Sequence, residues 1–193
     1  MKEVVEIRWH GRGGQGTVTA AKVFADTCLG SGQFVQAFPE YGPERAGAPL
    51  QAYNRISPKE LRKHCPVSRP DIVVVVDTTL LDNIDVTAGT TDQTVFLVNS
   101  GKNMERLKEN IKPAAGQKVF CVDGSRIAMD AIGRPLPNAP MVGALAKVSG
   151  IAALDLEVVV KAVEKSFGKK FPQKIVDGNK AATKKGWEEV REW

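Results

Sequence analysis

Residues 9–25, WHGRGGQGTVTAAKVFA, place a glycine-rich turn between a strand-like run and a helix-like run near the start of the chain. Gly11, Gly13 and Gly16 match the pattern G-x-G-x-x-G. Glycines permit a tight turn and close backbone approach, and the N-terminus of the following helix offers free N–H groups to an anion. The stretch therefore predicts the start of an α/β fold. Two interpretations of the turn stay open: an anion-binding loop, or a close connection between a strand and a helix.

The second predicted strand argues against a bound dinucleotide. A dinucleotide-binding fold typically has Asp or Glu at the end of that strand, where the carboxylate binds the ribose hydroxyls. Here the strand, residues 33–38, runs into Pro39, and Glu40 beyond the proline is a poor substitute. The side chains of Arg12 and Gln15 nevertheless favour a function, because glycine alone could make the turn. An anionic group is the alternative ligand, and the candidate residues are Gly11, Arg12, Gly13, Gly14, Gln15 and Gly16.

The rest of the chain alternates between strand and helix patterns. The run DIVVVVD, residues 71–77, holds an isoleucine and four valines between two aspartates, and this β-branched stretch predicts a central strand covered on both faces. Residues 50–57 alternate imperfectly and predict a strand nearer an edge. Further strands are expected at 3–9, 94–100 and 118–124, and helices at 16–29, at 103–111 and from about residue 140 onward, where Asp155 is a plausible N-cap. The order predicts one three-layer, Rossmann-like α/β/α domain over residues 1–193, with a mostly parallel or mixed sheet.

A second candidate site is the loop around residues 41–47, which holds the adjacent charges Glu44 and Arg45. Loops that leave the carboxyl ends of parallel strands line the binding crevice of such sheets. The same edge would receive Asp77 and Asn99 from the ends of two later strands. Two other interpretations stay open: a surface turn whose charges face water, and for Asp77 a helix cap.

The sequence shows no catalytic group or metal site of its own. His10 and His64 are too far apart in sequence to suggest a metal pair, and no Ser-His-Asp or H-E-x-x-H arrangement is present. The three cysteines form no close pair. Cys28 and Cys121 are expected in the core. Any part in catalysis would then be to help build a site within a larger assembly.

Composition and charge limit the class of protein. The 193 residues are 42% hydrophobic and 25% charged, and contain no apolar run long enough to span a membrane. The N-terminus lacks the apolar region of a signal peptide, so a cytoplasmic location is expected. The net charge of +5 reflects lysines concentrated late in the chain. Without a nucleic-acid-binding motif, these lysines indicate a solvated surface or a face for an acidic partner, not a nucleic-acid site.

Four ordered blocks carry a resemblance to a known family. They are IRWHGRGGQG at 7–16, YGPERAGAPLQAYNRIS at 41–57, PDIVVVVDTTLL at 70–81 and NAPMVGALAKVSG at 138–150. Together they closely resemble the gamma chains of pyruvate:ferredoxin oxidoreductase (pyruvate synthase) and its 2-oxoacid relatives. The 46–57 part of the second block resembles the pyruvate-type gamma chains more than the 2-oxoglutarate or indolepyruvate ones.

The resemblance implies one enzyme divided among alpha, beta, gamma and delta chains. Thiamine diphosphate is then expected on the alpha and beta chains and [4Fe-4S] clusters on the delta and beta chains. The complex would convert pyruvate and coenzyme A to acetyl-CoA and CO₂ and reduce ferredoxin. The gamma chain would border the coenzyme A route, with the 11–16 turn, Glu44 and Arg45 as contacts. The alternative, resting on the glycine pattern alone, is a stand-alone nucleotide-binding oxidoreductase.

Overall fold

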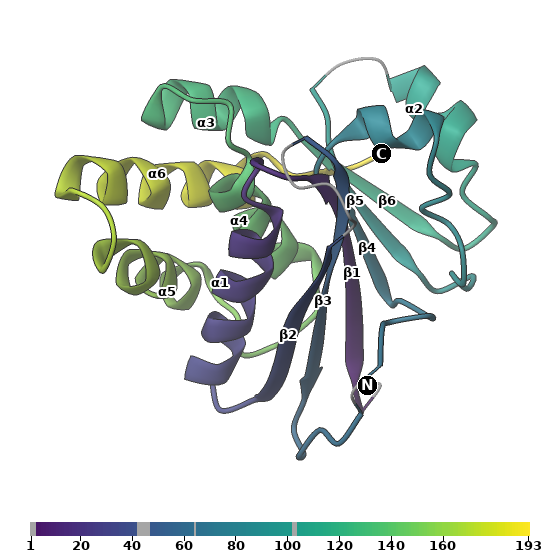
Figure 1. Cartoon of the computed structure of the whole chain (residues 1–193), viewed down its shortest axis with the longest axis horizontal. Coiled ribbons are helices and arrows are strands. Elements are labelled where there is room, and N and C mark those ends of the chain that lie inside the picture. The colour runs from purple at the N-terminus through teal and green to yellow at the C-terminus, as the bar shows by residue number, and fades with distance from the viewer. Residues whose placement is uncertain (1–2, 42–46, 64, 102–103) are drawn as a thin grey trace.

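The computed structural model describes residues 3–41, 47–63, 65–101 and 104–193, and within these ranges one seven-stranded sheet forms the centre of the molecule (Figure 1). Its order is β2-β3-β1-β4-β5-β6-β7. Five strands run in one direction, whereas β3 and β7 run against them, so the predicted mostly parallel, mixed sheet is confirmed. The strands are β1 (Val5–Arg12), β2 (Phe34–Tyr41), β3 (Pro49–Ser57), β4 (Ile72–Val75), β5 (Val95–Asn99), β6 (Lys118–Val122) and β7 (Arg191–Glu192).

Strand β4 lies in the middle of the sheet, as its valine run predicts. All of its residues, Ile72–Val75, are buried. Ile72 and Val74 belong to one apolar core, and Val73 and Val75 to a second core on the opposite face. Because side chains alternate between faces, a strand buried on both sides reads as a continuous apolar run.

The prediction that residues 50–57 form a strand nearer an edge is confirmed. Strand β3 is next to the edge strand β2 and pairs with β1 on its other side. The polar side chain of Asn54 is nevertheless fully buried. The Asn54 amide accepts a hydrogen bond from the indole of Trp9 at 2.7 Å and donates to the carbonyl oxygen of Ala21 at 2.9 Å. These partners satisfy the polar groups that burial would otherwise penalise.

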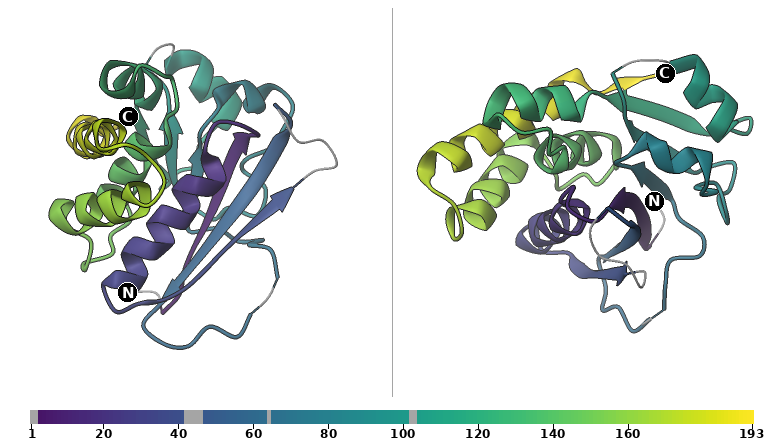
Figure 2. Two further views of the ribbon diagram at one scale, coloured as in Figure 1. Left: turned by 60° about the vertical axis from the view of Figure 1, so that its left-hand side comes forward. Right: turned by 45° about the horizontal axis from the view of Figure 1, so that its top comes forward.

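Helices cover both faces of the sheet, unequally (Figure 2). One face carries α1 (Thr17–Gly30), α3 (Gly124–Ile132), α4 (Asn138–Val148), α5 (Leu156–Gly168) and α6 (Gln173–Glu189). The other face carries α2 (Met104–Ile111) and the 3-10 turn η1 (Thr78–Asp82). The predicted helices are confirmed except at the end of the chain, where the helix predicted to continue gives way to residues 191–192 of a strand. The Asp155 cap is confirmed, and its side chain accepts from the backbone N–H of Val158 at 2.8 Å. Helix α3 and strand β7 were not predicted. None of the helices in the described ranges combines the length and the apolar character that a bilayer span requires.

The two cysteines expected in the core are buried there. Cys28 is fully buried and Cys121 is 8% exposed. Burial raises the pKa of Cys28 to about 12 and that of Cys121 to about 11, so both thiols stay protonated and act as small apolar side chains.

Helices α4 and α6 approach so closely that two glycines are required between them. A methyl group on Gly186 would lie 2.1 Å from the carbonyl oxygen of Pro140, and one on Gly143 would lie 2.1 Å from that of Thr183. Both clashes involve backbone, which cannot rotate away. The α4–α6 contact therefore depends on residues without a side chain.

We predict that Gly186→Ala lowers the free energy of unfolding by about 1–3 kcal/mol, the usual cost of overpacking. The matched control is Gly30→Ala at the end of α1, where an added methyl meets no atom within 4 Å. That variant should be neutral or gain up to about 1 kcal/mol. Denaturant unfolding of both variants measures the difference, and equal midpoints would contradict the close helix contact.

Candidate functional site

The candidate site lies where the order of strands reverses. From β1 the chain continues to β2 and β3 on one side of the sheet, whereas β4 leads to β5 and β6 on the other side. Strands β1 and β4 are parallel neighbours, so their carboxyl ends lie side by side at this switch point, the place where α/β sheets of this kind bind ligands in a crevice. Arg12 ends β1, Asp77 follows β4, and Asn99 ends β5.

The glycine turn has the geometry that its sequence predicts. Gly16 is the N-cap of α1 and adopts a left-handed conformation, with φ of 77°. An added methyl on Gly16 would lie 3.0 Å from the Asn138 side chain, and one on Gly11 would lie 2.0 Å from the Thr17 hydroxyl. Within the described residues no side chain caps the first turn of α1. The backbone N–H groups of that turn therefore remain available to an anion.

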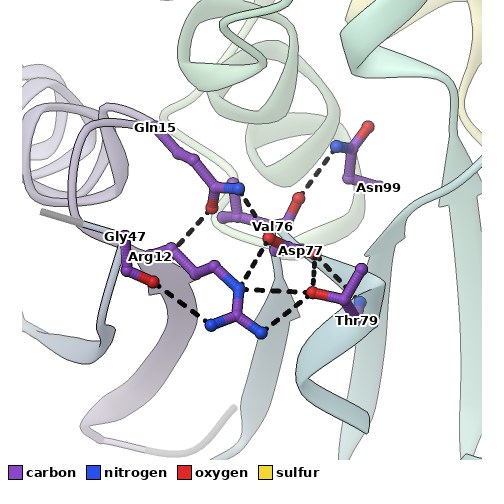
Figure 3. Close-up of polar contacts among 7 residues, drawn as sticks. All are labelled: Arg12, Gln15, Gly47, Val76, Asp77, Thr79 and Asn99. Atoms are coloured by element: carbon purple, nitrogen blue, oxygen red, sulfur yellow. Dashed lines mark hydrogen bonds and ion pairs between the residues drawn. The ribbon is translucent and has the colours of Figure 1, made fainter. Parts of the chain in front are cut away.

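The Asp77 carboxylate connects the turn to the end of β4 (Figure 3). Its Oδ2 accepts from Gln15 Nε2 at 2.6 Å and from Arg12 Nε at 3.2 Å. Its Oδ1 accepts from the backbone N–H of Thr79 at 2.9 Å and from the Thr79 hydroxyl at 2.8 Å. Gln15 Oε1 in turn accepts from the backbone N–H of Arg12 at 2.8 Å. Side chains 62 to 67 positions apart in sequence are thus held as one unit.

The Arg12 guanidinium is held in place by several hydrogen bonds and still has N–H donors without a partner among the described residues. Besides its ion pair with Asp77, it donates from Nη2 to the Thr79 hydroxyl at 3.0 Å and from Nη1 to the carbonyl oxygen of Gly47 at 3.2 Å. Its side chain stays 30% exposed. Arginine has five N–H donors, so one N–H on each Nη takes no partner among the described residues. The crevice therefore presents a fixed cation with donors to spare.

Asp77 remains charged although its side chain is only 13% exposed. Desolvation alone would raise the pKa of this carboxyl, but hydrogen bonds from Thr79 and Gln15 and the nearby charge of Arg12 outweigh it, so the pKa of Asp77 is lowered. Asp77 is also the N-cap of η1. The cap interpretation is therefore confirmed, and the same carboxylate contacts Arg12 and Gln15 at the switch point.

Asn99 supports the neighbouring part of the same edge. Its Nδ2 donates to the carbonyl oxygen of Val76 at 2.8 Å and to the Ser125 hydroxyl at 2.9 Å, and its Oδ1 accepts from the backbone N–H of Ser125 at 3.2 Å. The amide thereby joins the end of β4 to the start of α3. Its side chain is fully engaged in this connection.

The structure brings together six of the predicted site residues in one turn: Gly11, Arg12, Gly13, Gly14, Gln15 and Gly16. Glu44 and Arg45 lie outside the described residues. The end of their loop contacts the turn, because Gly13 donates to the carbonyl oxygen of Ala48 at 3.0 Å and Gly47 donates to that of Gly13 at 3.1 Å.

Sequence reasoning missed the role of Thr79, whose hydroxyl joins Arg12 to Asp77. The signal was present, since a Thr two positions after an Asp is typical of a side-chain-capped turn. It also missed a buried polar pair on β1. Arg8 donates to His10 Nε2 at 3.0 Å and to the carbonyl oxygens of Val86 and Ala88 at 3.0 and 2.7 Å.

Neither Glu40, the candidate carboxylate for a ribose, nor His10, a potential base, is free for that role. The Glu40 carboxylate accepts a hydrogen bond from the Tyr53 hydroxyl. Desolvation, followed by the charge of Arg8, lowers the pKa of His10 to about 3, so this imidazole stays neutral. No group of three or more potential metal ligands occurs within the ranges that the structure describes.

The model of the pyruvate ferredoxin/flavodoxin oxidoreductase family matches residues 6–189. The chain belongs to this family. Its subunit type is gamma, in agreement with the sequence resemblance. It is 46% identical over 190 residues to pyruvate synthase subunit PorC of Thermotoga maritima, with 98% of this chain and 96% of that protein covered. It is 44% identical over 164 residues to the common subunit gamma of the pyruvate/ketoisovalerate oxidoreductases of Thermococcus kodakarensis, with 85% and 87% covered.

One solved structure agrees with this assignment, and a second shares the fold. The crystal structure of the Thermotoga maritima subunit superposes with a TM-score of 0.84 at 41% identity and covers 99% of both chains. The 2-oxoglutarate:ferredoxin oxidoreductase of Magnetococcus marinus, described with 2-oxoglutarate, coenzyme A and succinyl-CoA bound, superposes with a TM-score of 0.72. The match covers 96% of this gamma chain and 31% of that longer chain at 19% identity, so it shows a shared fold.

We predict that Asp77→Asn lowers the free energy of unfolding at pH 7 by about 2 kcal/mol, because hydrogen bonds to a charged group are lost. The folded-state pKa of Asp77 is depressed, so its contribution is present above the unfolded-state value and lost as pH falls through the folded-state value. The difference between variant and wild type should therefore shrink as the pH falls below about 4.

The control is Asp26→Asn on the exposed face of α1, where the described residues provide no partner for the carboxylate. Its unfolding free energy should stay within about 0.5 kcal/mol of wild type. Denaturant unfolding at several pH values measures both variants. A loss for Asp77→Asn that does not change with pH would argue against the charged network.

Proposed function

We propose that this chain is the gamma subunit of a pyruvate synthase, a multi-chain oxidoreductase that converts pyruvate and coenzyme A to acetyl-CoA and CO₂ and reduces ferredoxin. The likeness to the Thermotoga maritima PorC subunit over nearly the whole of both chains supports this activity. The Thermococcus kodakarensis relative is named as common to pyruvate and ketoisovalerate oxidoreductases. That name supports a division of roles among the subunits, in which chains other than gamma select the 2-oxoacid.

Within the complex, the proposed role of the chain is to form the wall of the coenzyme A site. One observation carries this role: the Arg12 guanidinium is fixed at the crevice by Asp77 and Thr79 and keeps unused N–H donors. Guanidinium donors suit phosphate oxygens, and the uncapped first turn of α1 lies beside them. Glu44 and Arg45 are proposed as further contacts from the adjoining loop.

The proposed role is binding and orientation, without a chemical step on this chain. Thiamine diphosphate would supply the decarboxylation chemistry, held by the alpha and beta subunits, and [4Fe-4S] clusters of the beta and delta subunits would carry electrons to ferredoxin. His10, the titratable side chain beside the turn, is buried, neutral and bonded to Arg8. It is therefore not offered as a base.

The subunit assignment predicts that the tagged chain, purified from cells that produce the whole complex, emerges with its partners. The copurified material should contain thiamine diphosphate and show the visible absorbance of iron–sulfur clusters, whereas the isolated chain should show neither. Recovery of the chain alone at native expression levels would overturn the assignment. A reconstituted complex that lacks only this chain provides the activity control.

The coenzyme A role predicts that Arg12→Ala raises KM for coenzyme A about 10–100-fold and leaves KM for pyruvate unchanged. The size follows from losing a hydrogen bond between charged groups, about 1.5–3 kcal/mol. Steady-state kinetics of the assembled complex measures both constants. The control is Arg62→Ala, whose side chain is 86% exposed on the connection between β3 and β4.

An unchanged KM for coenzyme A in the Arg12 variant would remove the phosphate contact and leave the subunit assignment intact. Equal increases in both KM values would instead indicate a general disturbance of the crevice. The Arg62 variant should match wild type in both constants.

A further inference from the structure

A groove outside the crevice runs between α1 and α5. Its volume is about 560 Å³. Four lysines line it: Lys22 from α1, Lys165 from α5, and Lys169 and Lys170 just beyond the end of α5. All four are exposed. The lysine-rich character predicted for the late part of the chain is therefore partly concentrated in one concave feature.

The charge of this groove is not balanced within the described part of the chain. Neighbouring lysines have partners: Lys161 pairs with Glu157 at 3.9 Å, and Lys180 pairs with Glu164 at 2.7 Å. None of the side-chain amines of the four groove lysines has an ion pair or hydrogen bond to a described residue. Asp26 is the single acidic residue among those lining the groove. Four lysines against one aspartate leave an excess of three positive charges, in a chain whose net charge is +5.

The floor of the groove is apolar. Val23 is buried at its base, and Val18 and Ala162 are half-buried along its walls. Leu29, near the end of α1, also lines the groove and is 58% exposed, so it adds uncovered apolar surface there. A small anion could neutralise the lysines but would leave this surface in contact with water. A polypeptide with carboxylates and apolar side chains satisfies both features.

We propose that the α1–α5 groove docks an acidic polypeptide segment of a neighbouring subunit. The proposal rests on the proposed function, because it takes the partner from the same complex. Carboxylates of that segment pair with the lysines at the rim, and an apolar side chain covers Leu29. Such charge complementarity speeds association and selects the partner.

This groove differs from the coenzyme A site in position. Leu29 lies twelve residues beyond Thr17 along α1, which at 1.5 Å per residue is about 18 Å. The groove extends from Val18 and Thr19 in the first turn of α1 to Leu29 and Gly30 at its end, and Arg12 is not among the residues that line it. A variant of the groove can therefore alter assembly without touching Arg12.

The test compares two double variants in the full complex, produced by coexpression of all subunits. Lys165→Glu with Lys169→Glu reverses charge inside the groove. The control, Lys184→Glu with Lys185→Glu, makes the same charge change at two exposed positions of α6 that do not line the groove. Retention of the gamma chain in the complex is measured by gel filtration over a range of salt concentrations. We expect the groove variant to be retained about tenfold less than the control, and wild-type retention to fall with rising salt.

A second measurement keeps the proposal testable if the groove variant folds poorly. Zero-length carbodiimide treatment of the wild-type complex joins lysine amines to carboxylates in direct contact. Mass spectrometry should find Lys165, Lys169 or Lys170 linked to an Asp or Glu of a partner subunit, with fewer links from Lys184 and Lys185.

Equal retention of the groove and control variants, together with an absence of groove crosslinks, would overturn the docking proposal. Normal retention with a raised KM for coenzyme A would also overturn it and would make the groove a ligand site. These outcomes are distinct from failure of the proposed function, in which the wild-type chain itself would not join the complex.

Discussion

The ion pair between Arg12 and Asp77 is the interaction on which the switch point depends. The two residues follow strands that are neighbours in the sheet and far apart in sequence, and no covalent connection sets their separation. Burial disfavours the charge on Asp77, but donors from both sides of the crevice preserve it. That charge in turn orders Arg12, whose side chain would otherwise carry about 2 kcal/mol of rotamer entropy. Because the Arg12 side chain is already ordered when the protein folds, the binding of an anion does not carry the entropy cost of ordering it.

The features predicted from sequence are those that a local pattern defines. The valine run of β4, the glycine turn and the capped helix α5 are continuous in sequence, and each has a characteristic residue pattern. The position of β3 near an edge was predicted, but the burial of its Asn54 was not, because this burial depends on Trp9, 45 residues away. The role of Gln15 was open for the same reason, since its partner Asp77 lies 62 positions further on. Helix α3 was not predicted because its N-cap Asp123 and its first residue Gly124 read as the end of the preceding strand.

The second face of the sheet explains why a histidine beside the turn has a structural role. Helix α2 and η1 cover β4, β5 and β6 on this face, and β1 is closed by the backbone around Val86, which Arg8 binds through two carbonyl oxygens. His10 supports the same guanidinium by accepting from its Nε. An imidazolium would face the Arg8 charge in a site without solvent, so protonation is strongly disfavoured. The pair therefore stabilises the connection after η1 and contributes no proton transfer to the crevice.

The crevice resembles a dinucleotide site in backbone and differs from it in charge. A dinucleotide fold places a carboxylate after its second strand, where it accepts hydrogen bonds from a ribose. Here β2 is displaced to the edge of the sheet by the antiparallel β3, and its Glu40 is occupied by Tyr53. The carboxylate of the crevice instead follows β4 and binds the protein's own arginine. The group presented to a ligand changes from an acceptor to a cationic donor, and this difference supports the proposal that the glycine turn binds an anion with accessible phosphate oxygens.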